Sequence, residues 1–212
     1  MDGLFGEMPT VLNMGNSEPV VRDPEEDSFW DKGLNKKYKP ATVENNHPSF
    51  VHPSQLIDEG GASVTLNNIM GTRYFICEGS SERMLKRSNN NRAEMRSGDG
   101  SHIGILPNVG SWTSFGSNAC RLESYSRHLC GCFRTSTDVS FRDGAGGESQ
   151  WLFEDAGTDN SGRQQYRLYT WSGVGFAPNG GIRRVGIDSG VLTSDSNGKD
   201  LKVVFRRNTS NY

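Results

Sequence analysis

A threefold internal repeat limits what this chain can fold into more than any other feature of its sequence. Leu66, Leu122 and Leu168 each lie in a short segment with the character of a strand. Apolar or aromatic residues recur eight and nineteen positions after each leucine, namely Tyr74, Cys130, Phe176, Leu85, Phe141 and Ile187. Each copy then ends in a further apolar segment, where Ile103, Trp151 and Val203 correspond, followed two residues later by Ile105, Phe153 and Phe205. Such a pattern indicates one supersecondary unit present three times.

The repeated segments are predicted to be strands. Apolar and polar residues alternate in "SVTLN", "YRLYT" and "LKVVF", and the connecting segments "SNNNR", "SGDGS", "DGAGG" and "TDNSG" consist of turn-forming residues. Glycine supplies 26 of the 212 residues, which favours short strands and tight turns over long helices. We therefore expect an all-β domain over residues 62–212, with four-stranded units at about 62–110, 118–157 and 164–207. A unit with one apolar face buries it only by sharing a core with the other two.

Three such units resemble the β-trefoil fold. The middle copy, "RLESYSRHLCGCFRTSTDVSFRD … SQWLFED", looks most like the arabinofuranosidase-B type of carbohydrate-binding domain, while "SVTLNNIMGTRYFICEGSS" and "YRLYTWSGVGFAPNGG" are looser matches. The resemblance covers about residues 62–207. It implies the architecture, and it implies sugar binding through a histidine, a tyrosine and an acidic residue. In the middle unit His128 is the histidine near that position, although it precedes its strand, and no unit carries the complete set.

Aromatic side chains suggest candidate glycan-binding residues. Exposed aromatic rings stack on sugar rings, and Tyr125 and Trp171 stand beside predicted turns. Together with His128 they form the candidate glycan site. The alternative reading of the same aromatics is that they cover the barrel or meet a neighbouring subunit.

Residues 1–61 are predicted to form an extended, non-globular arm. This segment contains six of the eight prolines and shows neither helical nor strand periodicity over more than a few residues. Isolated apolar residues along it are candidate anchors on other protein subunits: Phe5, Phe29, Trp30, Tyr38 and Phe50. A chain of this kind becomes ordered only when it packs on another surface.

Charge and motif content argue against several classes of function. The formal net charge is −2, so a general role in nucleic-acid binding is not expected. No stretch reaches the roughly 18 apolar residues that a membrane-spanning helix needs, and no secretory signal is visible, which predicts an intracellular or virion location. The acidic residues of the repeats lie in or beside turns, where solvated carboxylates are common, so we expect no enzyme activity, no cofactor and no metal site.

These observations predict a non-enzymatic structural or accessory subunit of a large assembly. The trefoil would be its rigid body and the arm its anchor to neighbouring subunits, as in capsid-associated proteins. The alternative is a carbohydrate-binding module or lectin.

Overall fold

The computed structural model describes residues 50–67, 71–107, 118–131, 137–143, 147–172, 181–194 and 198–209. Regular structure within these residues is almost all strand, which confirms the all-β prediction. The strands are β1 (Phe50–Val51), β2 (Tyr74–Glu78), β3 (Met84–Arg87), β4 (Ala93–Arg96), β5 (Gly104–Pro107), β6 (Cys120–Ser124), β7 (Arg127–Cys130), β8 (Ser140–Arg142), β9 (Gln150–Thr158), β10 (Gln164–Ser172), β11 (Gly181–Arg184), β12 (Gly186–Asp188), β13 (Val191–Thr193), β14 (Lys199–Asp200) and β15 (Lys202–Arg207). Two short 3-10 turns accompany them, η2 (Pro53–Gln55) and η4 (Gly147–Ser149).

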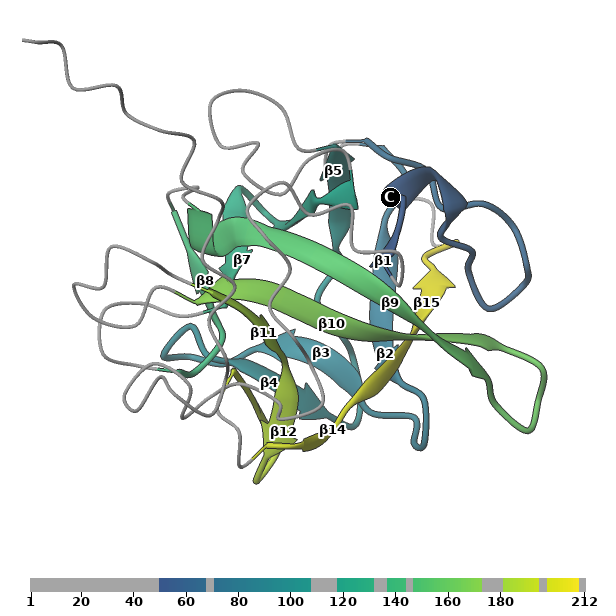
Figure 1. Ribbon diagram of the computed structural model, residues 1–212. Coiled ribbons are helices and arrows are strands. Elements are labelled where there is room, and N and C mark those ends of the chain that lie inside the picture. Colours follow the sequence, from purple (N-terminus) through teal and green to yellow (C-terminus); the bar gives the residue numbers. More distant parts are fainter. Residues whose placement is uncertain are drawn as a thin grey trace, which may run out of the picture.

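Six of the strands form a closed barrel (Figure 1). Going around it, β5 pairs with β6, β6 with β9, β9 with β10, β10 with β15, and β15 with β2, all antiparallel. An antiparallel bridge between Tyr74, the first residue of β2, and Ile103, just before β5, closes the ring. Each barrel strand therefore has a partner on both sides, which removes the exposed edges of an open sheet.

Equivalent strand pairs relate the three units to one another. Tyr74 lies opposite Ile103, Cys120 opposite Trp151, and Tyr166 opposite Val203. The first members of these pairs follow each other at equal intervals of 46 residues. Equivalent residues of the three units are thus evenly spaced along the chain in the structure, whereas Leu66, Leu122 and Leu168 are not.

The first unit begins later than that alignment predicts. Ile76 in β2 occupies the place of Leu122 and Leu168, so aligning Leu66 with those two leucines is wrong. Leu66 is half-buried and makes an isolated parallel bridge to Ile105. Apolar and polar residues alternate in its segment because the segment packs against the barrel. It precedes the first unit in the sequence. The alignment of the closing strands is confirmed, since all six of its positions are buried: Ile103, Ile105, Trp151, Phe153, Val203 and Phe205.

Three hairpins, one from each unit, pack on the core of the barrel. They are formed by β3 and β4, β7 and β8, and β12 and β13. Their second strands meet, because the Ala93 N–H donates to the Val139 carbonyl at 2.9 Å and the Val139 N–H donates to the Leu192 carbonyl at 2.9 Å. A six-stranded barrel capped by three hairpins is the β-trefoil arrangement that the repeat predicts.

Aromatic rings fill part of the barrel interior. Phe205 in β15 lies within 5.4 Å of Phe153 and 5.6 Å of Tyr166 between ring centroids, and 6.3 Å from Tyr74. All four side chains are almost completely buried. Trp151 is also buried, and its indole N–H donates to the Leu129 carbonyl at 2.8 Å, so its polar atom is satisfied inside the core.

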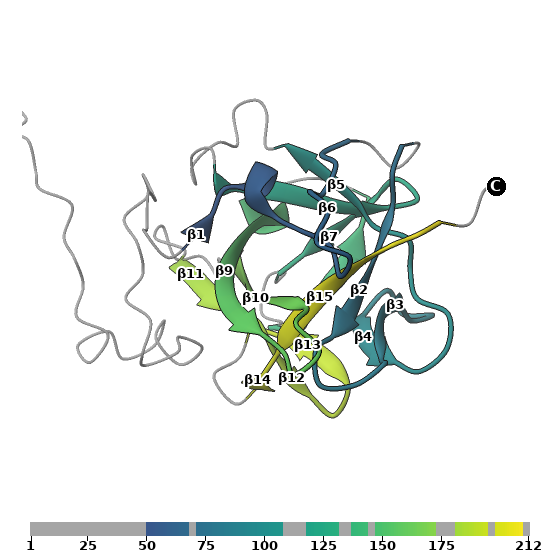
Figure 2. The same ribbon diagram turned by 90° about the vertical axis from the view of Figure 1, so that its right-hand side faces the viewer.

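Residues 50–67, which we call the strap, pack on the barrel ahead of the first unit. In Figure 2 the dark-blue ribbon runs from β1 past β9 towards β2. At its start, Phe50 and Val51 pair with Glu154 and Phe153 of β9. Farther along, Leu56 is completely buried in the main core. Residues 50–61, which composition places in the arm, therefore pack on the trefoil in the structure.

Two barrel tyrosines bind the strap backbone. The Tyr166 hydroxyl accepts a hydrogen bond from the Ile57 N–H at 2.9 Å, and the Tyr74 hydroxyl accepts one from the Thr65 N–H at 2.8 Å. Tyr74 and Tyr166 hold equivalent positions in the first and third units, where the middle unit has Cys120. The strap backbone is thus hydrogen-bonded to the first and third units, in which the residue at this position is a tyrosine with a hydroxyl group.

Candidate functional site

Tyr125 is the exposed aromatic side chain of the described structure. Its ring keeps 60% of its surface accessible, and it is the one large hydrophobic side chain among the described residues in that state. It lies in the two-residue turn between β6 and β7, where Tyr125 and Ser126 have φ values of 48° and 63°. Left-handed backbone in a residue other than glycine costs on the order of 1–3 kcal/mol, and such strain is concentrated at functional sites.

A histidine of the first unit lies beneath Tyr125. The Tyr125 hydroxyl is 3.2 Å from His102 Nδ1, and the two ring centroids are 6.1 Å apart. His102 is itself 9% exposed and packs edge-on against Phe75, at 5.1 Å between centroids. Burial and the nearby Arg73 lower the pKa of His102, so the imidazole is neutral at pH 7, and in the tautomer protonated on Nε2 its Nδ1 accepts a hydrogen bond from the Tyr125 hydroxyl.

His128 lies on β7, directly opposite Glu123 of β6. Burial lowers its pKa and outweighs the Glu123 carboxylate, which acts in the other direction. The imidazole Nδ1 is buried, as is the Nε of Arg121 two residues before Glu123, and neither atom has a hydrogen-bond partner in the described structure. Tyr125 and His128, two of the three candidate glycan-binding residues, both lie in the β6–β7 hairpin, and the hydroxyl of Tyr125 contacts His102 of the first unit.

The remaining candidate residues divide between described and undescribed parts of the chain. Phe50 is buried against Tyr169, with ring centroids 5.2 Å apart, so its ring packs within its own chain instead of being available to a neighbouring subunit. The other four arm anchors, Phe5, Phe29, Trp30 and Tyr38, lie outside the described residues. Trp171 belongs to β10, opposite Ile182, and its side chain is outside the description.

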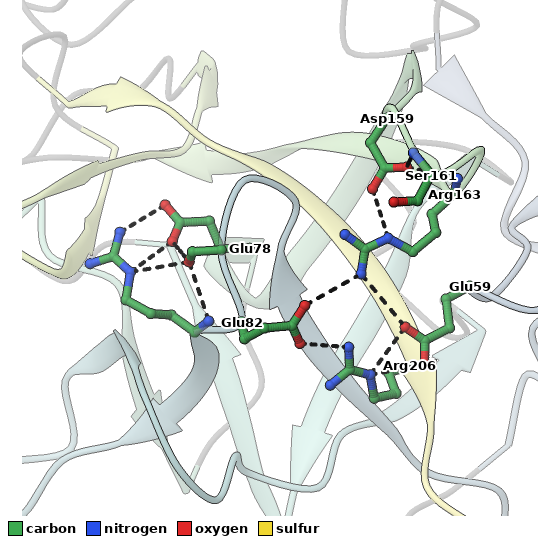
Figure 3. Close-up of polar contacts among 9 residues, drawn as sticks. Glu59, Glu78, Glu82, Asp159, Ser161, Arg163 and Arg206 are labelled. Carbon is green, nitrogen blue, oxygen red and sulfur yellow. Dashed lines mark hydrogen bonds and ion pairs between the residues drawn. The ribbon is translucent and has the colours of Figure 1, made fainter.

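A network of charged side chains joins the strap to the barrel (Figure 3). Arg206 of β15 bonds Glu59 of the strap at 2.8 Å and Glu82 of the β2–β3 turn at 2.9 Å. Arg163, beside the projecting turn between β9 and β10, bonds Asp159 at 2.7 Å and lies 3.9 Å from Glu59. The hydrogen bonds that Arg206 donates to the Glu82 and Glu59 carboxylates raise its pKa. The network therefore connects four separate chain segments: the strap, β15, the β2–β3 turn and the β9–β10 turn.

Four carboxyl groups of the described residues, those of Glu78, Glu82, Asp159 and Asp200, have pKa values below the usual range. Hydrogen bonds from Arg206 lower the pKa of Glu82, and those from the backbone and side chain of Arg163 lower that of Asp159. For Asp200, burial acts upwards, but Arg167 and Arg184 bind the carboxylate and lower its pKa overall. The general acid of a glycosidase needs a raised pKa, whereas the pKa values of these carboxyl groups are lowered.

Glu78 gives a testable pH dependence. Burial alone would raise its pKa, but a bidentate pair with Arg83, at 2.7 and 2.8 Å, and a hydrogen bond from Ser81 lower it. A lowered folded-state pKa gives stability that is present above pH 4 to 5 and is lost as the pH falls through the folded-state value. We expect Glu78→Gln to destabilise the domain by about 1 kcal/mol at pH 7, because a half-exposed arginine limits the gain.

Urea unfolding at pH 7 and pH 2.5 measures this effect. The difference between the Glu78→Gln variant and the parent chain should shrink at pH 2.5, where the parent carboxyl is protonated too. Lys86→Gln, on the exposed side of the adjacent strand, is the control. An equal difference at both pH values would show that the ion pair does not carry the effect.

Thiol and metal chemistry find little support among the described residues. Cys77 and Cys120 are free and buried, and burial raises the pKa of Cys77 to about 11, so its thiol stays protonated at neutral pH. No group of three or more His, Cys, Asp or Glu side chains within the described ranges is arranged to hold a metal ion. None of the helical segments described has the length and apolar character that crossing a bilayer requires.

An open groove of about 590 Å³ lies between β4 and the β12–β13 turn. Its charged lining is mixed, with Arg83, Arg96 and Lys199 beside Glu94 and Asp188. Arg83 pairs with Glu78, and Arg96 pairs with Glu94. Two of its three cations are therefore already compensated, which gives the groove no strong preference for an anion.

Comparison with known proteins supports the fold. No protein-family model and no curated protein matches the sequence. Among solved structures, the Kunitz-type cysteine protease inhibitor PCPI-3 from potato superimposes with a TM-score of 0.51 and 14% sequence identity, covering 76% of this chain and 100% of the inhibitor. An identity this low supports the architecture alone. The described body of this chain is a β-trefoil.

Proposed function

We propose that this chain is a non-enzymatic structural or accessory subunit of a large intracellular or viral assembly. The trefoil is its rigid body, and the residues before Phe50 are its anchor to neighbouring subunits. Capsid-associated proteins are one class with this organisation.

The proposal rests on the contacts that attach the strap to the trefoil, because the strap directly follows the residues proposed as the anchor. Backbone pairing at Phe50, burial of Leu56 and the Glu59–Arg206 ion pair attach the strap along its length. Asp58 adds a further ion pair with Arg207 at 3.3 Å. An anchor can hold a body in place only if the segment between them is attached to that body, and these contacts attach the strap to the trefoil.

The electrostatic character of the trefoil also supports a non-catalytic role. Arginines hold Glu82, Asp159 and Asp200 ionised, and the ion pairs of Glu82 and Asp200 connect different strands and turns. Cross-links of this kind stabilise a shape, whereas a catalytic carboxyl pair needs one group that is held protonated.

Removal of residues 1–49 tests the proposal. We expect the chain that begins at Phe50 to keep the thermal stability of the full chain, because it retains the whole strap. Native mass spectrometry of both chains in extract from the source should place the full chain in a particle of defined mass and leave the shortened chain monomeric. A full-length variant with Phe5, Phe29, Trp30 and Tyr38 replaced by alanine should behave like the shortened chain. Incorporation of the chain that begins at Phe50 would contradict the proposal.

A second candidate function is carbohydrate binding by the middle unit. The exposure of Tyr125 on a strained turn favours it. The likeness of "RLESYSRHLCGCFRTSTDVSFRD" to arabinofuranosidase-B-type carbohydrate-binding domains points the same way. Binding of labelled full-length chain to a glycan array, compared with the Tyr125→Ala variant, tests this function.

A further inference from the structure

The open groove between β4 and the β12–β13 turn has the size and the walls of a binding site (Figure 2). Val191 pairs with Glu94, and the Met95 N–H donates to the Gly190 carbonyl at 2.8 Å, so backbone contacts fix the two sides. Met95 and Ile187 are buried beneath it. Its volume of about 590 Å³ falls within the range of roughly 300–1,000 Å³ that is usual for ligand pockets. We call this hollow, bordered by Arg83, Arg96, Asp188, Val191 and Lys199, the β4 groove.

Two guanidinium groups at the β4 groove are held by their edges. Arg83 forms a bidentate pair with Glu78 at 2.7 and 2.8 Å, and Arg96 is paired through its Nε with Glu94. A carboxylate binds the edge of the planar guanidinium and leaves its two faces available for stacking on an aromatic ring. The side chain of Arg96 remains 62% exposed in this arrangement. The ion pairs that remove a preference for an anion therefore leave a preference for an aromatic side chain.

One exposed charge of each sign completes the lining of the β4 groove. Asp188 ends β12, and Lys199 begins β14. The two lie near each other along the chain pairing, because Lys199 is opposite Ile187, the residue before Asp188. Both are exposed, so each is able to bind a charge on a ligand. A matching ligand carries an aromatic ring with one acidic and one basic group close to it.

The arm of this chain contains a segment with that composition. Trp30 is followed directly by Asp31 and Lys32, and it is the one tryptophan among residues 1–61. Tyr38 has a lysine on each side, and Phe5 has no charged residue directly beside it, so neither supplies both signs. Tryptophan is also among the residues that contribute most to protein interfaces, because it buries a large ring when it enters a pocket.

The start of the strap indicates that the arm reaches another copy. Traced back from Val51 to Phe50, the chain runs along β9 towards Thr158 and the projecting β9–β10 turn. In Figures 1 and 2, β1 lies in the upper part of the body, whereas β4 and β12 lie at its lower end. Twenty residues separate Trp30 from Phe50, and an extended chain of that length spans at most about 70 Å. That reach extends to a neighbouring subunit.

We propose that the β4 groove binds Trp30 of a neighbouring copy of this chain. The indole ring stacks on the guanidinium of Arg96, Lys199 binds Asp31, and Asp188 binds Lys32. This inference rests on the proposed function, in which the residues before Phe50 are an anchor, and it specifies where on the next subunit the anchor binds. Since the arm and the groove are different surfaces, the contact is heterologous and joins copies head to tail into a ring or a filament.

Sedimentation equilibrium of the purified full chain measures the proposed contact. Trp30→Ala should raise the dissociation constant of self-association at least tenfold, and Lys199→Glu at least fivefold. Adding Asp31→Lys to Lys199→Glu should recover at least threefold of that loss, because the two charges are then exchanged. Leu34→Ala in the arm and Arg87→Glu, on the exposed side of β3 and outside the groove, are the controls and should change it less than twofold. Circular dichroism checks that each variant is folded.

Mixing two defective variants tests whether the contact joins different copies. Trp30→Ala chains keep an intact groove, and Lys199→Glu chains keep an intact arm. Below the concentration at which either variant associates with itself, the mixture should form a one-to-one complex, because one productive contact remains. Native mass spectrometry identifies that complex, since the two variants differ in mass. Docking of each arm in the groove of its own chain gives no such complex.

The outcomes separate this site from the proposed function. Self-association that Trp30→Ala and Lys199→Glu weaken, with recovery on charge exchange and in the mixture, supports the β4 groove. Self-association, or incorporation into a particle in extract from the source, that needs the arm but is insensitive to Lys199→Glu overturns the groove and leaves the anchor in place. Monomeric behaviour of the full chain both when purified and in extract overturns both. Absence of the mixed complex overturns binding between copies.

Discussion

Removal of residues 50–61, the first two thirds of the strap, should unfold or severely destabilise the trefoil. A chain that begins at Ala62 loses Phe50, Leu56 and the backbone donor at Ile57, so it opens the packed core and leaves the buried Tyr166 hydroxyl without its partner. Truncating one buried leucine to alanine costs about 2–5 kcal/mol, and small domains are stable by only about 5–15 kcal/mol. We expect a loss of several kcal/mol relative to the chain that begins at Phe50.

Urea denaturation followed by circular dichroism measures this loss. Leu56→Ala in the full chain should reproduce a large part of it, about 3 kcal/mol, because Leu56 is fully buried. Leu66→Ala, in the same strap but half-buried, should cost about half as much. Equal unfolding midpoints for the chains beginning at Phe50 and Ala62 would show that residues 50–61 do not stabilise the trefoil.

The strap also shows where sequence reasoning fails. Residues 50–61 have the proline and charge content of an arm, and only Phe50, Leu56 and Ile57 suggest a packed segment. Their attachment depends in part on a backbone group, the Ile57 N–H, which donates to the Tyr166 hydroxyl. Backbone donors look the same in every sequence, so neither composition nor periodicity reveals such an attachment.

The repeat was easier to predict at its end than at its beginning. The closing strands carry alternating large apolar residues in all three units, such as Phe153 and Phe205, because they line the barrel interior. The opening strand of the first unit starts at Tyr74, whose equivalent in the middle unit is Cys120. A tyrosine and a cysteine have little in common as side chains, and the nearby "SVTLN" offered a better apparent match at Leu66.

The candidate site was only half predictable for a related reason. Tyr125 and His128 are close in sequence and could be assigned to one unit. His102 lies 23 residues before Tyr125 and belongs to the first unit. The pairing of β5 with β6 brings it there, and that register depends on the closure of the barrel. Aligning the closing strand of one unit with the opening strand of the next would be the sequence signal for such contacts.

Replacing Phe205 by alanine should be among the most damaging single substitutions in the barrel. The ring is completely buried and meets Tyr74, Phe153 and Tyr166, which come from all three units. Phenylalanine-to-alanine changes in cores cost about 3–5 kcal/mol, and each lost aromatic pair adds about 0.5–1.5 kcal/mol to simple area loss. We expect about 4–5 kcal/mol by urea unfolding.

Phe75→Ala is the matched control for this prediction. Phe75 lies on β2, the strand that pairs with β15, but its ring is half-exposed and faces away from the barrel interior. Its loss should cost about 1–2 kcal/mol, since only part of its apolar area is removed from water. Phe205→Leu should fall between the two, because it keeps most of the volume and loses the edge-on ring contacts. If Phe205→Ala cost no more than Phe75→Ala, the three closing strands would not share one rigid core. That result would count against the proposal that the trefoil is the rigid body to which the anchor is attached.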